Sequence, residues 1–106
     1  MIGLTNRALG ILLGCLSGAL HAGCTQNNNE LNGLVGLDSE IGSVYAATTS
    51  VSNECSCAAV RFRPEITDTK MALSVLLSAK LAGKKVRVDL LDASDCNSAF
   101  RVYVQN

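Results

Sequence analysis

The stretch that decides the fold is the last forty residues, which contain TDTKMALSVLLSAKLAG at 67–83, KKVRVDLLD at 84–92, ASDC at 93–96 and SAFRVYVQ at 98–105. Thr67 or Asp68 can cap the free N–H groups of a helix N-terminus. Gly83 is the residue that most readily adopts the left-handed conformation at a helix C-terminus. The stretch therefore predicts one helix, apolar around most of its circumference and so deeply buried, followed by two strands.

Both segments after the helix alternate between apolar and polar residues, a pattern typical of strands with one buried face. The apolar positions are Val86, Val88 and Leu90 in the first segment and Phe100, Val102 and Val104 in the second. Upstream, three more strands are predicted at 31–37, 44–51 and 57–63. The first is rich in glycine, the second is rich in β-branched residues, and the third alternates until Pro64 ends it.

The first 22 residues have the three parts of a secretory signal peptide. Arg7 makes the N-terminal region positive, residues 8–20 form an apolar run of 13 residues, and Ala22 is a small residue at the cleavage position. Such a run is too short to cross a bilayer. A core helix is the alternative, but four glycines disfavour it. We therefore expect an exported chain, periplasmic or secreted, with a signal peptide at 1–22, a mobile polar lead-in at 23–30 and one domain at 31–106.

Cleavage after Ala22 would remove Cys15 and leave Cys24, Cys55, Cys57 and Cys96. An even number of cysteines in a small exported domain indicates two disulfides. A bridge between Cys55 and Cys57 would span one residue and be strained. Cys96 is therefore expected to pair with Cys55 or Cys57, and Cys24 with the other. Lipid attachment at Cys24 or Cys15 is the competing interpretation, and it is the one route by which we expect a membrane contact.

The predicted order, with the helix between the third and fourth strands, resembles the OB-fold, an all-β five-stranded Greek-key barrel with one helix. The stretch AVRFRPEITDTKMALSVLLSAKLAGKKVRVDLLDASDC at 59–96 resembles a set of small exported bacterial proteins of unknown function. Those proteins are similar in turn to the B subunits of pentameric AB-type bacterial toxins. This resemblance implies glycan binding and a homo-oligomer. The chain departs from toxin B subunits in having few aromatic residues: two Tyr, two Phe and no Trp.

The sequence offers no catalytic constellation. The single histidine, His21, lies in the predicted signal peptide, which excludes the usual Ser-His-Asp and Cys-His arrangements and a histidine metal site. Cys55 and Cys57 fit disulfides better than a metal or redox pair. Asp89, Asp92 and Asp95 lie beside strand ends, where aspartate is usual in turns. We expect no enzyme, no metal and no cofactor.

The basic residues form the one surface with a functional pattern. Nine basic and nine acidic residues cancel, so no general field for nucleic acid is expected. If the third, fifth and fourth strands are neighbours, as in the OB-fold, alternation gathers one outward patch: Arg61, Arg63, Lys85, Arg87, Arg101 and Tyr103. This patch is the candidate site for an anion or other ligand. The alternative is a solvated face on which long side chains cover the barrel.

The sequence thus predicts an exported, non-enzymatic binding module for a glycan or a protein surface. The alternative function is that of a free-standing periplasmic OB-fold protein that binds an anionic ligand through the basic face. The first function predicts a homo-oligomer. The second predicts a monomer whose binding weakens with salt.

Overall fold

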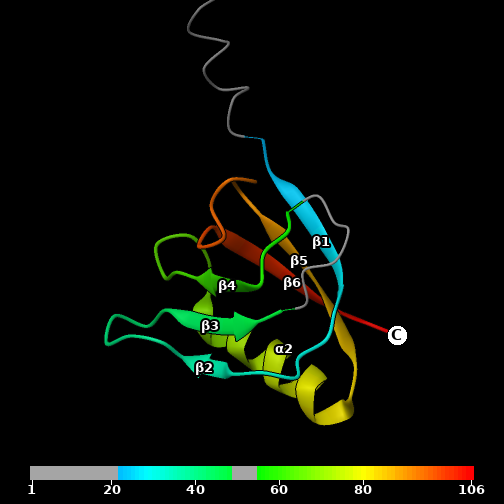
Figure 1. Ribbon diagram of the computed structural model, residues 1–106. Coiled ribbons are helices and arrows are strands. Elements are labelled where there is room, and N and C mark those ends of the chain that lie inside the picture. The colour runs from blue at the N-terminus through cyan, green and yellow to red at the C-terminus, as the bar shows by residue number, and fades with distance from the viewer. Residues whose placement is uncertain (1–21, 49–54) are drawn as a thin grey trace, which may run out of the picture.

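The computed structural model describes residues 22–48 and 55–106. The signal-peptide prediction for 1–22, Cys15 and the end of the second predicted strand therefore lie almost wholly outside the described residues. Within the described part, the chain is mostly sheet with one helix (Figure 1). Its elements are β1 Cys24–Asn29, β2 Val35–Leu37, β3 Val44–Ala47, β4 Ala59–Phe62, α2 Thr69–Ala82, β5 Lys85–Leu90 and β6 Ala99–Gln105.

The six strands form one mixed sheet in the order β1-β5-β6-β4-β3-β2. Neighbours are antiparallel except β4 and β6, which run parallel and pair at Phe62 and Ala99. The third, fifth and fourth predicted strands are β4, β6 and β5, and they are neighbours as expected. Figure 1 shows β1, β5 and β6 running together and β2 and β3 forming a second group.

The helix has the predicted ends. Asp68 caps its N-terminus by accepting a hydrogen bond from the Met71 N–H, and Gly83 ends it with φ 69°, in the left-handed region. α2 packs against β6, β2, β3 and β5 and so bridges the two groups of strands. However, the prediction that the helix is deeply buried is wrong. The sheet covers one side, which contains Ala72, Leu76 and Ala79, whereas Met71 and Leu81 are 62% and 88% exposed.

The mobile lead-in predicted for residues 23–30 is also wrong, because residues 24–29 form β1. This strand pairs with β5 through Cys24 and Leu90, Thr25 and Asp89, and Gln26 and Val88. Gln26 and Asn29 are both fully buried. Their amide groups bond to each other, to Thr48 and to the backbone of Cys57 and Val86, so the hydrogen-bonding groups they bury have protein partners.

In the part of the chain that the structure describes, the sheet has six strands where the sequence predicts five, and the early strands are shorter than predicted. Of residues 31–37, the last three form β2; β3 covers the start of 44–51, and β4 covers the middle of 57–63. The short segment 30–34 separates β1 from β2, which lie at opposite ends of the sheet order.

Two disulfides join the loops to the sheet: Cys24–Cys55, with the Cα atoms 5.7 Å apart, and Cys57–Cys96, with the Cα atoms 5.9 Å apart. The structure thus selects one of the two pairings that the sequence leaves open. Cys24, Cys55 and Cys57 are buried in the apolar core with Val44, Phe62, Leu76 and the inner residues of β5. In the described ranges, none of the helical structure is long and apolar enough to cross a membrane.

Candidate functional site on the outer face

Five polar side chains meet on the outer face of β1, β5 and β6. The register places Thr25 opposite Asp89, Asp89 opposite Arg101, and Arg87 opposite Tyr103. Residues opposite each other in an antiparallel sheet share a face, and positions 87 and 89 on β5 lie on the same face. We call Thr25, Arg87, Asp89, Arg101 and Tyr103 the Asp89 cluster.

Asp89 is the centre of this cluster. Arg87 donates from Nε to Oδ1 and from Nη2 to Oδ2, both at 3.0 Å, and Thr25 Oγ1 donates to Oδ1 at 2.9 Å. Arg101 Nε lies 3.0 Å from Oδ2. The Asp89 side chain is 3% exposed, whereas those of Arg87 and Arg101 are 39% and 52% exposed. Two guanidinium groups share one carboxylate, so the cluster presents one positive charge in excess.

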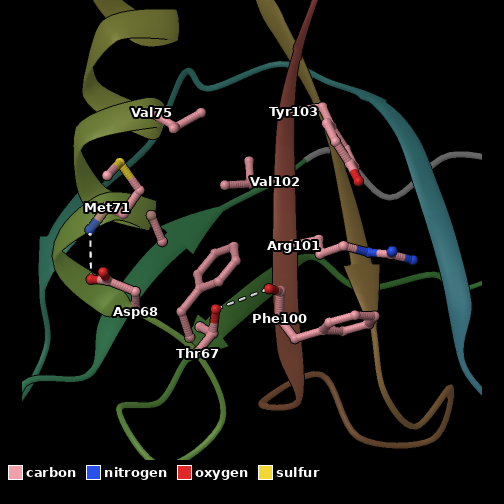
Figure 2. Close-up of a pocket in the computed structure, with 10 residues that line it drawn as sticks. Thr67, Asp68, Met71, Val75, Phe100, Arg101, Val102 and Tyr103 are labelled. Atoms are coloured by element: carbon pink, nitrogen blue, oxygen red, sulfur yellow. Dashed lines mark hydrogen bonds between the residues drawn. The ribbon is translucent and has the colours of Figure 1, made fainter.

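Aromatic rings flank both arginines. Arg87 Cζ lies 5.0 Å from the centre of the Tyr103 ring, and Arg101 Cζ lies 4.6 Å from that of Phe100. Both distances are within the range of cation–π attraction. Figure 2 shows Phe100, Arg101 and Tyr103 on the same side of β6. The predicted alternation would put Phe100 on the inner face, but the register shifts at Leu90 and Ala99, and Phe100 becomes an extra residue.

The electrostatics of the cluster favour an ionised Asp89. Burial by itself raises the pKa of this carboxyl, but the hydrogen bonds from Arg87 and Thr25 and the charges of Arg87 and Arg101 outweigh burial, so the pKa lies below its ordinary value. The same hydrogen bond to Asp89 raises the pKa of Arg87. The cluster is therefore a fixed arrangement of charges at neutral pH.

Acid should remove part of the stability that Asp89 supplies. Because its folded pKa is lowered from 3.8, its contribution is complete above that pH and is lost as the pH falls through the folded pKa. We expect Asp89→Asn to lower the free energy of unfolding by about 2 kcal/mol at pH 7. The free energy of unfolding of this variant should also fall less steeply than that of the wild type as the pH is lowered. Urea unfolding followed from about pH 6 down to 2 measures both. Glu65→Gln, at an exposed position, is the control, and an Asp89→Asn curve parallel to the wild-type curve would contradict the assignment.

The other predicted basic residues have acidic partners of their own. Arg61 forms an ion pair with Asp38 and also contacts the Tyr45 ring and Asn97. The hydrogen bond with Asp38, followed by its charge, raises the pKa of Arg61. Arg63 lies 3.8 Å from Glu65, and Lys85 lies 3.9 Å from Glu30. The predicted patch is therefore largely neutralised, and Arg87 and Arg101 are the two members that share a single acid.

Two contributors were not foreseen from the sequence. Thr25 lies in the segment interpreted as a lead-in, although the alternation of Cys24 and Gln26 with Thr25 was a usable signal. Phe100 reaches the outer face through the register shift, which no local pattern predicts. Asp92 and Asp95 have the expected turn roles, because each accepts a backbone N–H from two residues further on.

No family model, no curated protein and no solved structure matches this chain. Across residues 22–48 and 55–106, no group of three or more His, Cys, Asp or Glu side chains is arranged to hold a metal ion. Function must therefore be argued from the site itself. The Asp89 cluster offers cationic hydrogen-bond donors between aromatic faces, and such groups can bind an anion.

Proposed function

We propose that this chain is an exported, non-enzymatic binding module that holds an acidic glycan on the Asp89 cluster. The observation that supports this proposal is the sharing of Asp89 by Arg87 and Arg101. Arginine donates to carboxylate and sulfate groups in a planar, two-pronged geometry. The exposed ring of Tyr103 offers an apolar face to a sugar.

Asp89 would act by preorganising the arginines. Its carboxylate holds Arg87 through Nε and Nη2 and holds Arg101 through Nε. The Nη groups of Arg101 can then donate to a ligand without the entropy cost of fixing a mobile side chain, and that saving strengthens binding. Arg101 is the more exposed of the two arginines, and we propose that it makes the first contact with the acid group.

The fold and the export route belong to the same proposal. We propose an OB-fold-like barrel in which β1 and β2 are the two halves of one bent first strand, because β1 pairs with β5, β2 pairs with β3, and a short segment joins them. The two disulfides are compatible with an exported protein. The sulfur of Cys24 is bonded to Cys55, so we favour a protein without a lipid at Cys24.

A simpler anion-binding role is the alternative, in which a periplasmic monomer binds a small inorganic anion. The aromatic flanks separate the two functions, because a sugar ring uses Tyr103 and an inorganic anion does not. Tyr103→Ala should therefore weaken glycan binding and leave sulfate binding unchanged. Native mass spectrometry of the exported protein tests the homo-oligomer that the toxin resemblance implies.

Binding of acidic glycans should depend on Arg101. On an array that pairs sialylated and sulfated glycans with their neutral counterparts, we expect the acidic forms to bind and salt to weaken them. Arg101→Gln should reduce the affinity for the best glycan by about tenfold, as measured by calorimetric titration. Lys84→Gln removes the same charge from an exposed position between α2 and β5 and is the matched control. Equal binding of neutral glycans, or an Arg101→Gln protein with wild-type affinity, would refute the proposal.

A further inference from the structure

One edge of β6 has no described strand beside it along most of its length. β6 pairs with β5 from Ala99 to Gln105, but it pairs with β4 at one position, Phe62 with Ala99. Beyond that position, Thr67 at the start of the helix donates a hydrogen bond to the Phe100 carbonyl. Within the described residues, the part of the edge from Arg101 onward therefore has no neighbouring strand and lies beside α2. Free strand edges are templates for pairing with another chain.

The backbone groups on this edge can be assigned. The Phe100 carbonyl points toward Thr67, away from β5, and the directions of backbone groups alternate along a strand. The N–H and C=O groups of Val102 and Val104 therefore point away from β5, whereas those of Arg101 and Tyr103 point toward it. The pairing of β5 with β1 leads to the same assignment. The Val86 carbonyl accepts a hydrogen bond from the Asn29 side chain on β1, so the backbone groups of Arg87 and Asp89 point toward β6.

A small apolar groove lies beside this edge, between β6 and the first half of α2. Its volume is about 190 Å³, and Phe62, Met71, Val75 and Val102 supply its apolar wall. Figure 2 shows Val102 directed toward Val75 and Met71, opposite to Arg101 and Tyr103. Ligand pockets usually measure about 300 Å³ or more. The groove therefore suits one or two apolar side chains better than a whole small molecule.

Charge around the groove indicates an acidic occupant. Asp68, on the helix side, is offset by the positive N-terminus of α2 and accepts the Met71 N–H. Arg101, on the strand side, shares Asp89 with Arg87, and this leaves one positive charge in excess. A strand added next to β6 would direct alternate side chains to the groove and to the outer face. A second copy of the chain would bring the same excess positive charge, whereas an acidic segment complements it.

We propose that this edge binds an extended peptide segment of another protein, in which apolar and acidic residues alternate, as an added strand. Its backbone pairs with Val102 and Val104, its apolar side chains enter the groove against Met71 and Val75, and its acidic side chains face Arg101. In this mode the backbone hydrogen bonds supply affinity and the side-chain pocket supplies specificity. The site shares Arg101 and Tyr103 with the Asp89 cluster, but the backbone edge and the groove wall formed by Met71, Val75 and Val102 lie outside that cluster.

The probe is a synthetic peptide with Val and Glu alternating over eight residues, compared with the matched peptide of Val and Lys. We expect the folded, disulfide-bonded protein to bind the Val-Glu peptide and not the Val-Lys peptide. Met71→Glu should weaken binding by about tenfold or more, because it places a negative charge in the groove. Leu81→Glu, at an exposed position outside the groove on the same helix, should bind as the wild type does. Val104→Pro removes an outward N–H without removing a bond to β5 and should also weaken binding.

Hydrogen exchange measured by NMR identifies the binding mode. On adding the Val-Glu peptide, the N–H groups of Val102 and Val104 should exchange more slowly, while those of Arg101 and Tyr103 stay protected in both states. Unchanged exchange at both valines, equal binding of the two peptides, or full binding by Met71→Glu would overturn the proposal. A protein that sediments as a dimer and is dissociated by Met71→Glu would also overturn it, because a second copy would then occupy the edge.

Discussion

Removal of the Cys57–Cys96 disulfide, by Cys57→Ala with Cys96→Ala, is expected to lower the free energy of unfolding by about 3 to 4 kcal/mol. The bridge closes a sequence separation of 39 residues, and a loop of that length loses considerable entropy when it is cross-linked in the unfolded chain. Domains of this size are stable by only about 5 to 10 kcal/mol. The variant should therefore lose between about a third and about four-fifths of its stability.

The position of this disulfide makes the loss larger. β4 and β6 are joined at a single paired position, Phe62 with Ala99, and this junction connects the two groups of strands. The disulfide and the hydrogen bond from the Arg61 N–H to the Cys96 carbonyl reinforce it. Cys57 is also 1% exposed, so its replacement removes packed sulfur from the core.

The second disulfide supplies the comparison. Cys24–Cys55 closes a separation of 31 residues, which gives nearly the same loop entropy. Urea unfolding of the two double variants should therefore show a greater loss of stability when Cys57 and Cys96 are replaced. The difference between the two losses measures what this disulfide adds to the junction between β4 and β6. Equal losses would mean that the junction does not depend on the bridge. Losses below about 1 kcal/mol in both variants would show that neither disulfide is needed for stability.

The sequence predicted those elements whose signals are local. Asp68 and Gly83 mark the helix ends because capping depends on a few adjacent backbone groups. The alternation of Val86 and Val88 with Arg87 predicted β5 and its outer face, because one residue pattern records which side is buried. The side of the sheet that carries Arg87, Arg101 and Tyr103 was predictable for the same reason.

Features that depend on distant partners were not predictable. Gln26 can be buried because its side chain bonds to the backbone of Cys57, without which a polar residue would lie in water. Cys57 is 31 positions away in the sequence, so no local pattern predicts this contact. The neutralisation of Arg61 depends on Asp38, on a different segment. Leu81 is exposed because the sheet covers only one side of α2. The helix sequence alone does not indicate how much of the helix surface the sheet can cover.

Gln26→Leu should be the most damaging single substitution within the hydrogen-bond network. Gln26 Oε1 accepts the Cys57 N–H at 2.7 Å, and Nε2 donates to the Cys57 carbonyl at 2.9 Å and to Asn29 Oδ1 at 2.6 Å. Leucine has a similar size but no polar group, so it leaves the Cys57 N–H and the Asn29 oxygen buried without this partner. Each such group costs about 1 to 3 kcal/mol, and we expect a total loss of about 3 to 4 kcal/mol.

The matched control is Gln105→Leu, the same substitution at a partly exposed position on β6. Gln105 accepts an exposed hydrogen bond from the Asn28 N–H, and water can replace that bond, so the expected loss is below about 1 kcal/mol. Urea unfolding of both variants with the disulfides intact gives the comparison. If Gln26→Leu costs no more than Gln105→Leu, the buried amides do not hold β1 to the sheet. The alternative would be that the pairing with β5 and the Cys24–Cys55 bridge suffice to keep β1 in place.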